Sequence, residues 1–135
     1  MNKLNGIITQ IQKSGAILLV DVDVDGQDFS ALLIESADPP DWLKVGGAVD
    51  VVFKETELSL AKGFTGKISM RNRMPCKVLH IERGDLLCIV KLKYRSYSIA
   101  SAITTRAVDS LQIAVGDELD ALVKSNEISL MRKKS

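Results

Sequence analysis

The side chains of this 135-residue chain that are best suited to hold a ligand are hydrogen-bond donors in its second half. They form a Ser-Met-Arg run, a threonine further along and a Lys-Ser pair: Ser69, Met70, Arg71, Thr104, Lys124 and Ser125. Hydroxyl, ammonium and guanidinium groups can all donate hydrogen bonds to anionic oxygen atoms. Taken singly, Arg71 and Lys124 are typical of solvated surface cations, and the hydroxyl residues are typical of turns. Their significance therefore depends on the spacing of the whole set.

Residues for catalysis or for metal coordination are scarce. His80 is the only histidine, and no partner in the sequence suggests acid–base chemistry with it. Cys76 and Cys88 form no CxxC pair, so a structural zinc site is poorly supported, and both are expected to be reduced thiols of the core. We therefore expect a binding protein, with no enzymatic activity and no directly coordinated metal.

The composition is that of a globular protein with almost balanced charge. Hydrophobic residues make up 46%, and 18 Lys and Arg face 17 Asp and Glu, which leaves a net charge of +1. A pair of nucleic-acid-binding barrels is one alternative, but the near-zero charge and 4% aromatic content count against it. The sequence has neither a signal-like apolar segment near Met1 nor a run long enough to cross a membrane. A cytoplasmic location without membrane contact is expected.

The sequence repeats itself after a gap-free shift of 70 residues. The matching positions lie at both ends of the repeat and include Asn2/Asn72, Ile11/Ile81, Val20/Val90, Gly46/Gly116, Asp50/Asp120, Lys54/Lys124, Glu57/Glu127 and Leu60/Leu130. We predict one module over residues 1–62, a linker over 63–68 and a second module over 69–135. A module of this size is marginal alone, so association is expected.

Within each repeat the apolar residues alternate with a period of two, which predicts strands. The predicted strands are 4–12, 16–25, 28–35, 48–54 and 57–62, and in the second repeat 74–82, 86–93, 97–104, 118–124 and 127–132. Asp25-Gly26 indicates a hairpin turn. A short helical turn is expected at 36–42 or 105–112, and Pro39-Pro40 shortens the first of these. The predicted fold is all-β, with two tandem five-stranded barrel modules of the oligonucleotide/oligosaccharide-binding (OB) kind.

The second repeat resembles the molybdate-binding Mop domain, which is of the TOBE type. The resemblance rests on the opening Ser69-Met70-Arg71-Asn72, the spaced Thr104, the stretch from Ser110 to Gly116, and Lys124-Ser125. The hallmark of the family is an opening Ser-Ala-Arg-Asn followed by a spaced Thr and a Lys-Ser. The first repeat resembles it more loosely, and the tandem arrangement resembles the di-Mop proteins.

This resemblance implies an oxyanion site for molybdate or tungstate, with no organic cofactor. The oxyanion would be held by hydrogen bonds from Ser69, Met70, Arg71, Thr104, Lys124 and Ser125, without a carboxylate. In the family such pockets lie between subunits, so the resemblance implies that Ser69 and Arg71 of one chain face Thr104, Lys124 and Ser125 of a neighbour. It also implies a homotrimer, with a homodimer as the alternative. One departure is Ala107, because the family often has a serine three residues after the threonine.

The first repeat departs from the motif at most of these positions. Met1, Ile34 and Glu55 stand where the second repeat has Arg71, Thr104 and Ser125. Lys54 alone is retained, and the neighbouring carboxylate of Glu55 would repel a dianion. We therefore predict that the first repeat is structural and that the second repeat binds the ligand.

Two functions remain open at this point. The first is intracellular binding of molybdate or tungstate for storage and homeostasis. The second is a ligand-sensing or interaction module that works with a separate transcription regulator or transporter subunit. The chain has neither a recognisable helix-turn-helix nor a P-loop, so DNA binding or ATP hydrolysis would have to come from partner chains.

Overall fold

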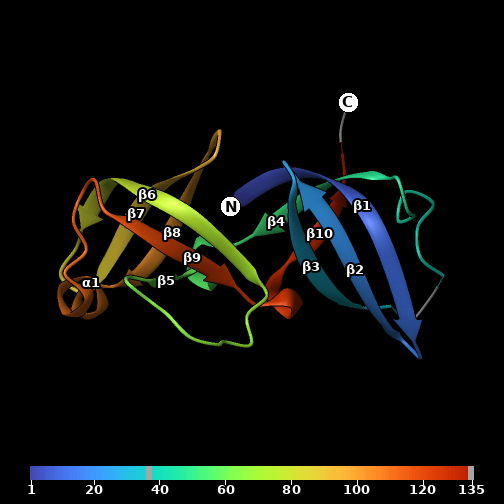
Figure 1. Ribbon diagram of the computed structural model, residues 1–135, viewed down its shortest axis with the longest axis horizontal. Coiled ribbons are helices and arrows are strands. Elements are labelled where there is room, and N and C mark those ends of the chain that lie inside the picture. Colours follow the sequence, from blue (N-terminus) through green and yellow to red (C-terminus); the bar gives the residue numbers. More distant parts are fainter. Residues whose placement is uncertain (36–37, 134–135) are drawn as a thin grey trace.

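Alternation of apolar and polar residues builds two antiparallel β-sheets that lie next to each other in the computed structural model (Figure 1). The structure describes residues 1–35 and 38–133. The first repeat forms β1 (Asn2–Ser14), β2 (Ile17–Val24), β3 (Gln27–Ile34), β4 (Ala48–Phe53), the 3-10 turn η1 (Glu55–Glu57) and β5 (Ser59–Ala61). The second forms β6 (Asn72–Arg83), β7 (Leu87–Tyr94), β8 (Tyr97–Thr104), α1 (Thr105–Leu111), β9 (Glu118–Val123), η2 (Ser125–Glu127) and β10 (Ser129–Arg132).

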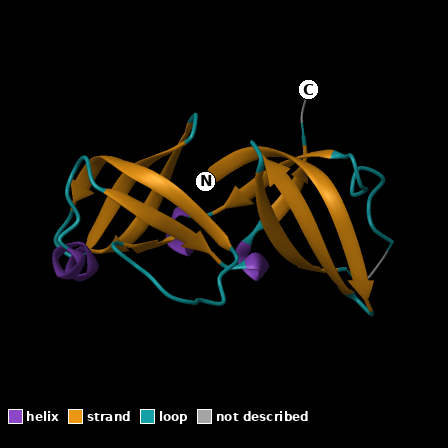
Figure 2. Ribbon diagram, viewed as in Figure 1, coloured by secondary structure: helices purple, strands orange, loops and turns teal. Residues whose placement is uncertain are grey.

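Each sheet has five strands, as predicted, and its edge strands curl towards each other. The strand order is β10-β4-β1-β2-β3 in the first sheet and β5-β9-β6-β7-β8 in the second. The edge strands β10 and β3 contact each other, and so do β5 and β8. The all-β prediction with two five-stranded units and a short helix is therefore confirmed (Figure 2).

The last strands of the two repeats are exchanged between the sheets. β5 of the first repeat pairs with β9, with Ser59 opposite Leu122, and β10 of the second repeat pairs with β4, with Ser129 opposite Val52. The expectation that each repeat closes its own five-stranded unit is thus corrected, because each sheet takes one strand from the other repeat. The exchange makes the two sheets dependent on each other and places η1 and η2 at their junction (Figure 2).

The core is continuous across the junction. Every second residue of β2 and β7 is buried, including Val20, Val22, Val90 and Leu92, and these side chains fill the interior of their sheets. The rings of Phe29 and Tyr94, one from each sheet, meet edge to face with centroids 6.2 Å apart. Both rings are almost completely buried, so the junction is packed like the interior of a domain.

The turns and the helix follow the sequence signals in part. Asp25 and Gly26 both have positive φ angles, 50° and 87°, as a two-residue hairpin turn that follows the twist of the strands requires. The helix α1 occupies the second of the two predicted positions. In the first repeat, residues 38–42 contain no helix, and Ser36 and Ala37 lie outside the described residues. None of the helices in the part of the chain that is described has the length and apolarity needed to span a membrane.

Candidate functional site

A buried asparagine at the start of β6 fastens the second repeat to the edge strand of the first sheet. Asn72 is completely buried, and its side chain binds both backbone groups of one residue of β3. It accepts a hydrogen bond from the Ser30 N–H (2.7 Å) and donates to the Ser30 carbonyl (2.9 Å) and the Val123 carbonyl (3.1 Å). This side chain thereby fixes the position of Ser30 beside the Ser-Met-Arg run and the Lys-Ser pair.

Two of the predicted site residues meet at Ser30. The hydroxyl groups of Ser125 and Ser30 are hydrogen-bonded at 2.6 Å, which joins η2 to β3. Arg71 lines a cavity of about 90 Å³ together with Ser30, Phe29 and two carboxylates, those of Asp21 and Asp28. The fold therefore brings Arg71 and Ser125 to one place at the junction of the sheets, although they are far apart in the sequence.

The carboxylates in this cavity were not expected. The sequence predicted a site made of donors alone, but within one chain Asp21 and Asp28 line the same cavity as Arg71. They come from β2 and β3 of the first sheet, which the strand exchange and Asn72 place against the second repeat. Two negative charges beside one guanidinium group oppose the binding of a dianion in an isolated chain.

The remaining donors of the second repeat lie near this place on exposed segments. Lys124 has an extended backbone and directly precedes η2, whose Glu127 N–H binds the Lys124 carbonyl at 3.0 Å. Ser69 is exposed and Met70 half-buried in the segment that leads into β6. Within the described part of the chain, no ion pair or hydrogen bond occupies the side chains of Arg71 and Lys124, so both cations remain available to a ligand.

The structure does not bring Thr104 to the other predicted residues of the same chain. Thr104 is the last residue of β8, and its hydroxyl caps α1 by accepting a hydrogen bond from the Ala107 N–H at 3.1 Å. α1 lies at the outer end of the second sheet, whereas η2 lies at the junction (Figures 1 and 2). Thr104 lines a different cavity, together with Asp85, Arg106 and others. Its role in one chain is that of a helix cap.

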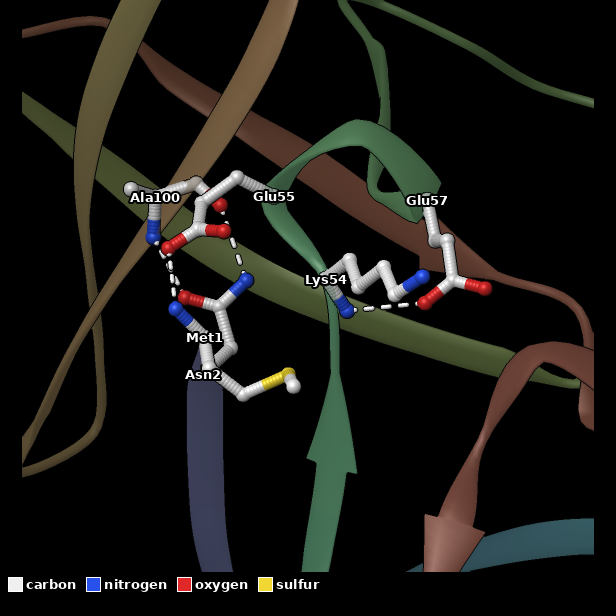
Figure 3. A network of polar contacts seen from close by, with 6 residues as sticks. All are labelled: Met1, Asn2, Lys54, Glu55, Glu57 and Ala100. Carbon is white, nitrogen blue, oxygen red and sulfur yellow. Dashed lines mark hydrogen bonds and ion pairs between the residues drawn. The ribbon is translucent and has the colours of Figure 1, made fainter.

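The repeat places a second, related cluster at the junction, and this one contains a carboxylate (Figure 3). Asn2 binds the backbone of Ala100 through two hydrogen bonds of 2.8 Å, as Asn72 binds that of Ser30. Glu55 stands where the second repeat has Ser125, and its carboxylate binds the amino group of Met1. The pKa of Glu55 is lowered, mainly by the hydrogen bond from that ammonium group and secondly by a backbone hydrogen bond. A negative charge therefore lies where the other cluster has a hydroxyl.

Sequence reasoning missed Ser30, Asp21 and Asp28 as neighbours of the site. All three belong to the first repeat, and the counterpart of Ser30 in the second repeat is Ala100, so no shared motif marks it. The only available signal was Asn72, which the repeat matches to Asn2. Its partner across the junction could not be read from the sequence.

Part of this chain is similar to a known domain family and to proteins of molybdenum transport. Residues 68–130 match the model of the TOBE domain. The molybdenum import ATP-binding protein ModC of Brucella abortus is 32% identical over 108 residues, which are 79% of this chain and 28% of that protein. The molybdenum transport protein ModE of Herbaspirillum seropedicae is 28% identical over 127 residues, which are 92% of this chain and 47% of that protein.

A solved structure extends the comparison to nearly the whole chain. The cytoplasmic molybdate-binding protein ModG, with molybdate bound, superposes with a TM-score of 0.89 at 23% identity, covering 98% of this chain and 96% of that one. At this identity the match establishes the fold. The chain spans less than half the length of the curated relatives ModC and ModE. Residues 68–130 of this chain match the TOBE domain, and its two sheets together have the fold of the ModG structure.

Proposed function

We propose that this protein binds molybdate inside the cell, for storage and homeostasis, at the junction of its two sheets. Residues 68–130, which match the TOBE domain, include every donor of the predicted set. The relatives named above are molybdenum transport and import proteins, and the protein that shares the fold binds molybdate. These similarities support the proposal, and the geometry of the junction supports the site that we propose.

The observation that carries the proposal is the meeting of Ser125 with Ser30 beside Arg71. Molybdate is a tetrahedral dianion with four acceptor oxygens and no proton at neutral pH, so it binds to hydroxyls, N–H groups and cations. The Ser30–Ser125 hydroxyl pair, with Arg71 beside it and Lys124 next in sequence, offers such donors at one place. Tungstate has the same charge and nearly the same size, and we propose that it binds there too.

Asp21 and Asp28 set a condition on this site. Because their charges oppose a dianion, a single chain holds molybdate weakly, and further donors must come from elsewhere. We propose that a second copy of the chain completes the site and that Thr104, at the outer end of β8, contributes from that copy. Three chains, each with two units, would form the assembly, and a dimer is the alternative.

Equilibrium dialysis against molybdate in sulfate-free buffer tests the proposal. The wild-type protein is expected to retain molybdenum, and Arg71→Ala is expected to weaken retention at least tenfold, because Arg71 is the cation that lines the cavity. Lys13→Ala is a suitable control, because Lys13 is exposed near the end of β1 and belongs to none of the proposed site. No retention by the wild-type protein, or equal retention by Arg71→Ala, would overturn it.

A second candidate function follows from the lengths of the relatives. The chain covers 28% of ModC and 47% of ModE, so a module of this kind also occurs as part of larger proteins. In this alternative the chain is a ligand-sensing module that works with a separate transporter subunit or transcription regulator. Co-sedimentation with such a partner that appears only when molybdate is present would favour sensing, whereas molybdate retention without any partner favours storage.

A further inference from the structure

The outer faces of the two sheets carry opposite charges at matching positions of the repeat. Asp21 and Asp23 of β2 stand where β7 has Lys91 and Lys93. In both strands the residues between them are buried, so these four side chains share the outward-facing side of their sheets. We call Asp21, Asp23 and Asp28 the acidic face, and Lys77, Lys91 and Lys93 the basic face.

Each face places like charges directly opposite each other on paired strands. Asp23 of β2 is in register with Asp28 of β3, and Lys93 of β7 is in register with Lys77 of β6. Like charges in this arrangement destabilise a sheet. Each of these pairs would therefore be stabilised by a counter-charge placed against it.

Ion pairs within the chain do not supply this counter-charge. Among the described residues, Asp23, Asp28, Lys77 and Lys93 take part in no ion pair within 4.0 Å, although Glu118 lies in register with Lys77 on the other side. The remaining two members have weak partners. Lys91 approaches Glu82 only to 3.9 Å, with both side chains about half exposed, and Asp21 shares its cavity with Arg71.

Next to its charges, each face continues into exposed apolar residues. On the first sheet Ile17 is in register with Ile34, and Leu19 with Leu32. Ile17 is 46% exposed and Ile34 is 80% exposed. On the second sheet Leu87, 51% exposed, precedes Ile89, which is in register with Ala102. The order of apolar and charged residues along β2 and β7 is the same.

We propose that a second copy of this chain docks here, with its basic face on the acidic face of the first copy and the apolar ends in contact. The chain itself is the partner that carries both faces, with the charges and the apolar residues in the same order. Metal ions do not account for the acidic face, because the described residues contain no cluster of His, Cys, Asp and Glu able to hold one. The contact specifies which surfaces meet in the assembly that the proposed function requires, and Asp21 and Asp28 of the acidic face also line the cavity of the proposed molybdate site.

Charge reversal tests this contact by sedimentation equilibrium over a range of protein concentrations. Lys93→Asp and Asp23→Lys are each expected to weaken self-association at least tenfold, because each sets like charges against each other across the interface. Lys67→Asp is the matched control, since Lys67 is exposed in the loop between β5 and β6 and belongs to neither face. It is expected to leave self-association unchanged.

Combining the two charge reversals distinguishes a lost contact between copies from a variant that fails to fold. An equimolar mixture of the Lys93→Asp and Asp23→Lys proteins is expected to associate more strongly than either variant alone, because the first variant keeps its acidic face and the second keeps its basic face. The double variant Asp23→Lys/Lys93→Asp is expected to associate with itself. A wild-type protein that stays monomeric, reversals that leave its mass unchanged, or a mixture that remains monomeric would overturn the proposal. Loss of molybdate retention with normal association would instead contradict the proposed function alone.

Discussion

Replacement of Asn72 tests how the junction holds the two sheets together. Its side chain is fully buried and makes three hydrogen bonds, two to Ser30 and one to Val123. Each bond contributes about 1 kcal/mol net, and partners left unsatisfied in a buried place add to the cost, so Asn72→Ala should lower the free energy of unfolding by ~3 kcal/mol. For a chain of this length that corresponds to a fall in the melting temperature of roughly 10 °C.

Replacement of Asn72 by aspartate separates the loss of hydrogen bonds from the addition of a buried charge. Asn72→Asp keeps the acceptor for the Ser30 N–H but turns the donor to the Ser30 and Val123 carbonyls into a carboxylate oxygen. A buried charge facing two carbonyl oxygens is expected to cost more than the alanine does. Thermal and urea unfolding measure both variants, with Asn5→Ala as the control, because the side chain of Asn5 is exposed. Values for both Asn72 variants within about 0.5 kcal/mol of wild type would refute the reasoning.

Two further predictions concern ionisation. The Ala114 N–H and the Lys62 ammonium group hydrogen-bond to Asp117 and lower its pKa below the ordinary value of 3.8. The ionised carboxylate therefore stabilises the folded protein above pH 3.8, and this stabilisation is lost as the pH falls through the lowered pKa. The free energies of unfolding of wild type and Asp117→Asn should differ at pH 6 and converge at acid pH. A difference that stays constant with pH would contradict this prediction. Burial raises the pKa of the Cys76 thiol to about 12, and Cys88 is fully buried. Neither thiol should react with a thiol reagent at pH 8 until the protein is unfolded, and rapid labelling of the native protein would count against this packing.

The strands could be predicted from the sequence because their signals are local. Alternating burial follows from alternating apolar residues, and the strand Tyr97–Thr104 was predicted at the bounds that the structure gives it. The exchange of β5 and β10 could not be predicted, because the same pattern suits a strand in either sheet. Which sheet accepts the strand is decided by the path of the chain after η1 and η2, and the sequence pattern does not contain that information.

The site was predictable only in part for the same reason. Arg71 and Ser125 were expected at one site but from neighbouring chains, whereas the fold brings both to Ser30, a residue of the other repeat, within one chain. Thr104 was expected beside Lys124 and Ser125 of its own chain, but its hydroxyl there caps α1. A cap is a local feature, because the Thr104 hydroxyl binds an N–H only three positions further along the chain. The contacts across the junction depend on tertiary packing.

Calorimetric titration of molybdate into wild type, Lys124→Ala and Lys54→Ala tests the proposed function most directly. Lys124 and Lys54 are counterparts in the repeat, but Lys124 precedes Ser125 and Lys54 precedes Glu55. Molybdate is therefore expected to bind to wild type and Lys54→Ala with equal affinity and stoichiometry, and to Lys124→Ala at least tenfold more weakly, a difference of about 1.4 kcal/mol. Equal weakening by both substitutions, or no binding to the wild-type protein, would contradict a molybdate site at the Ser30–Ser125 junction.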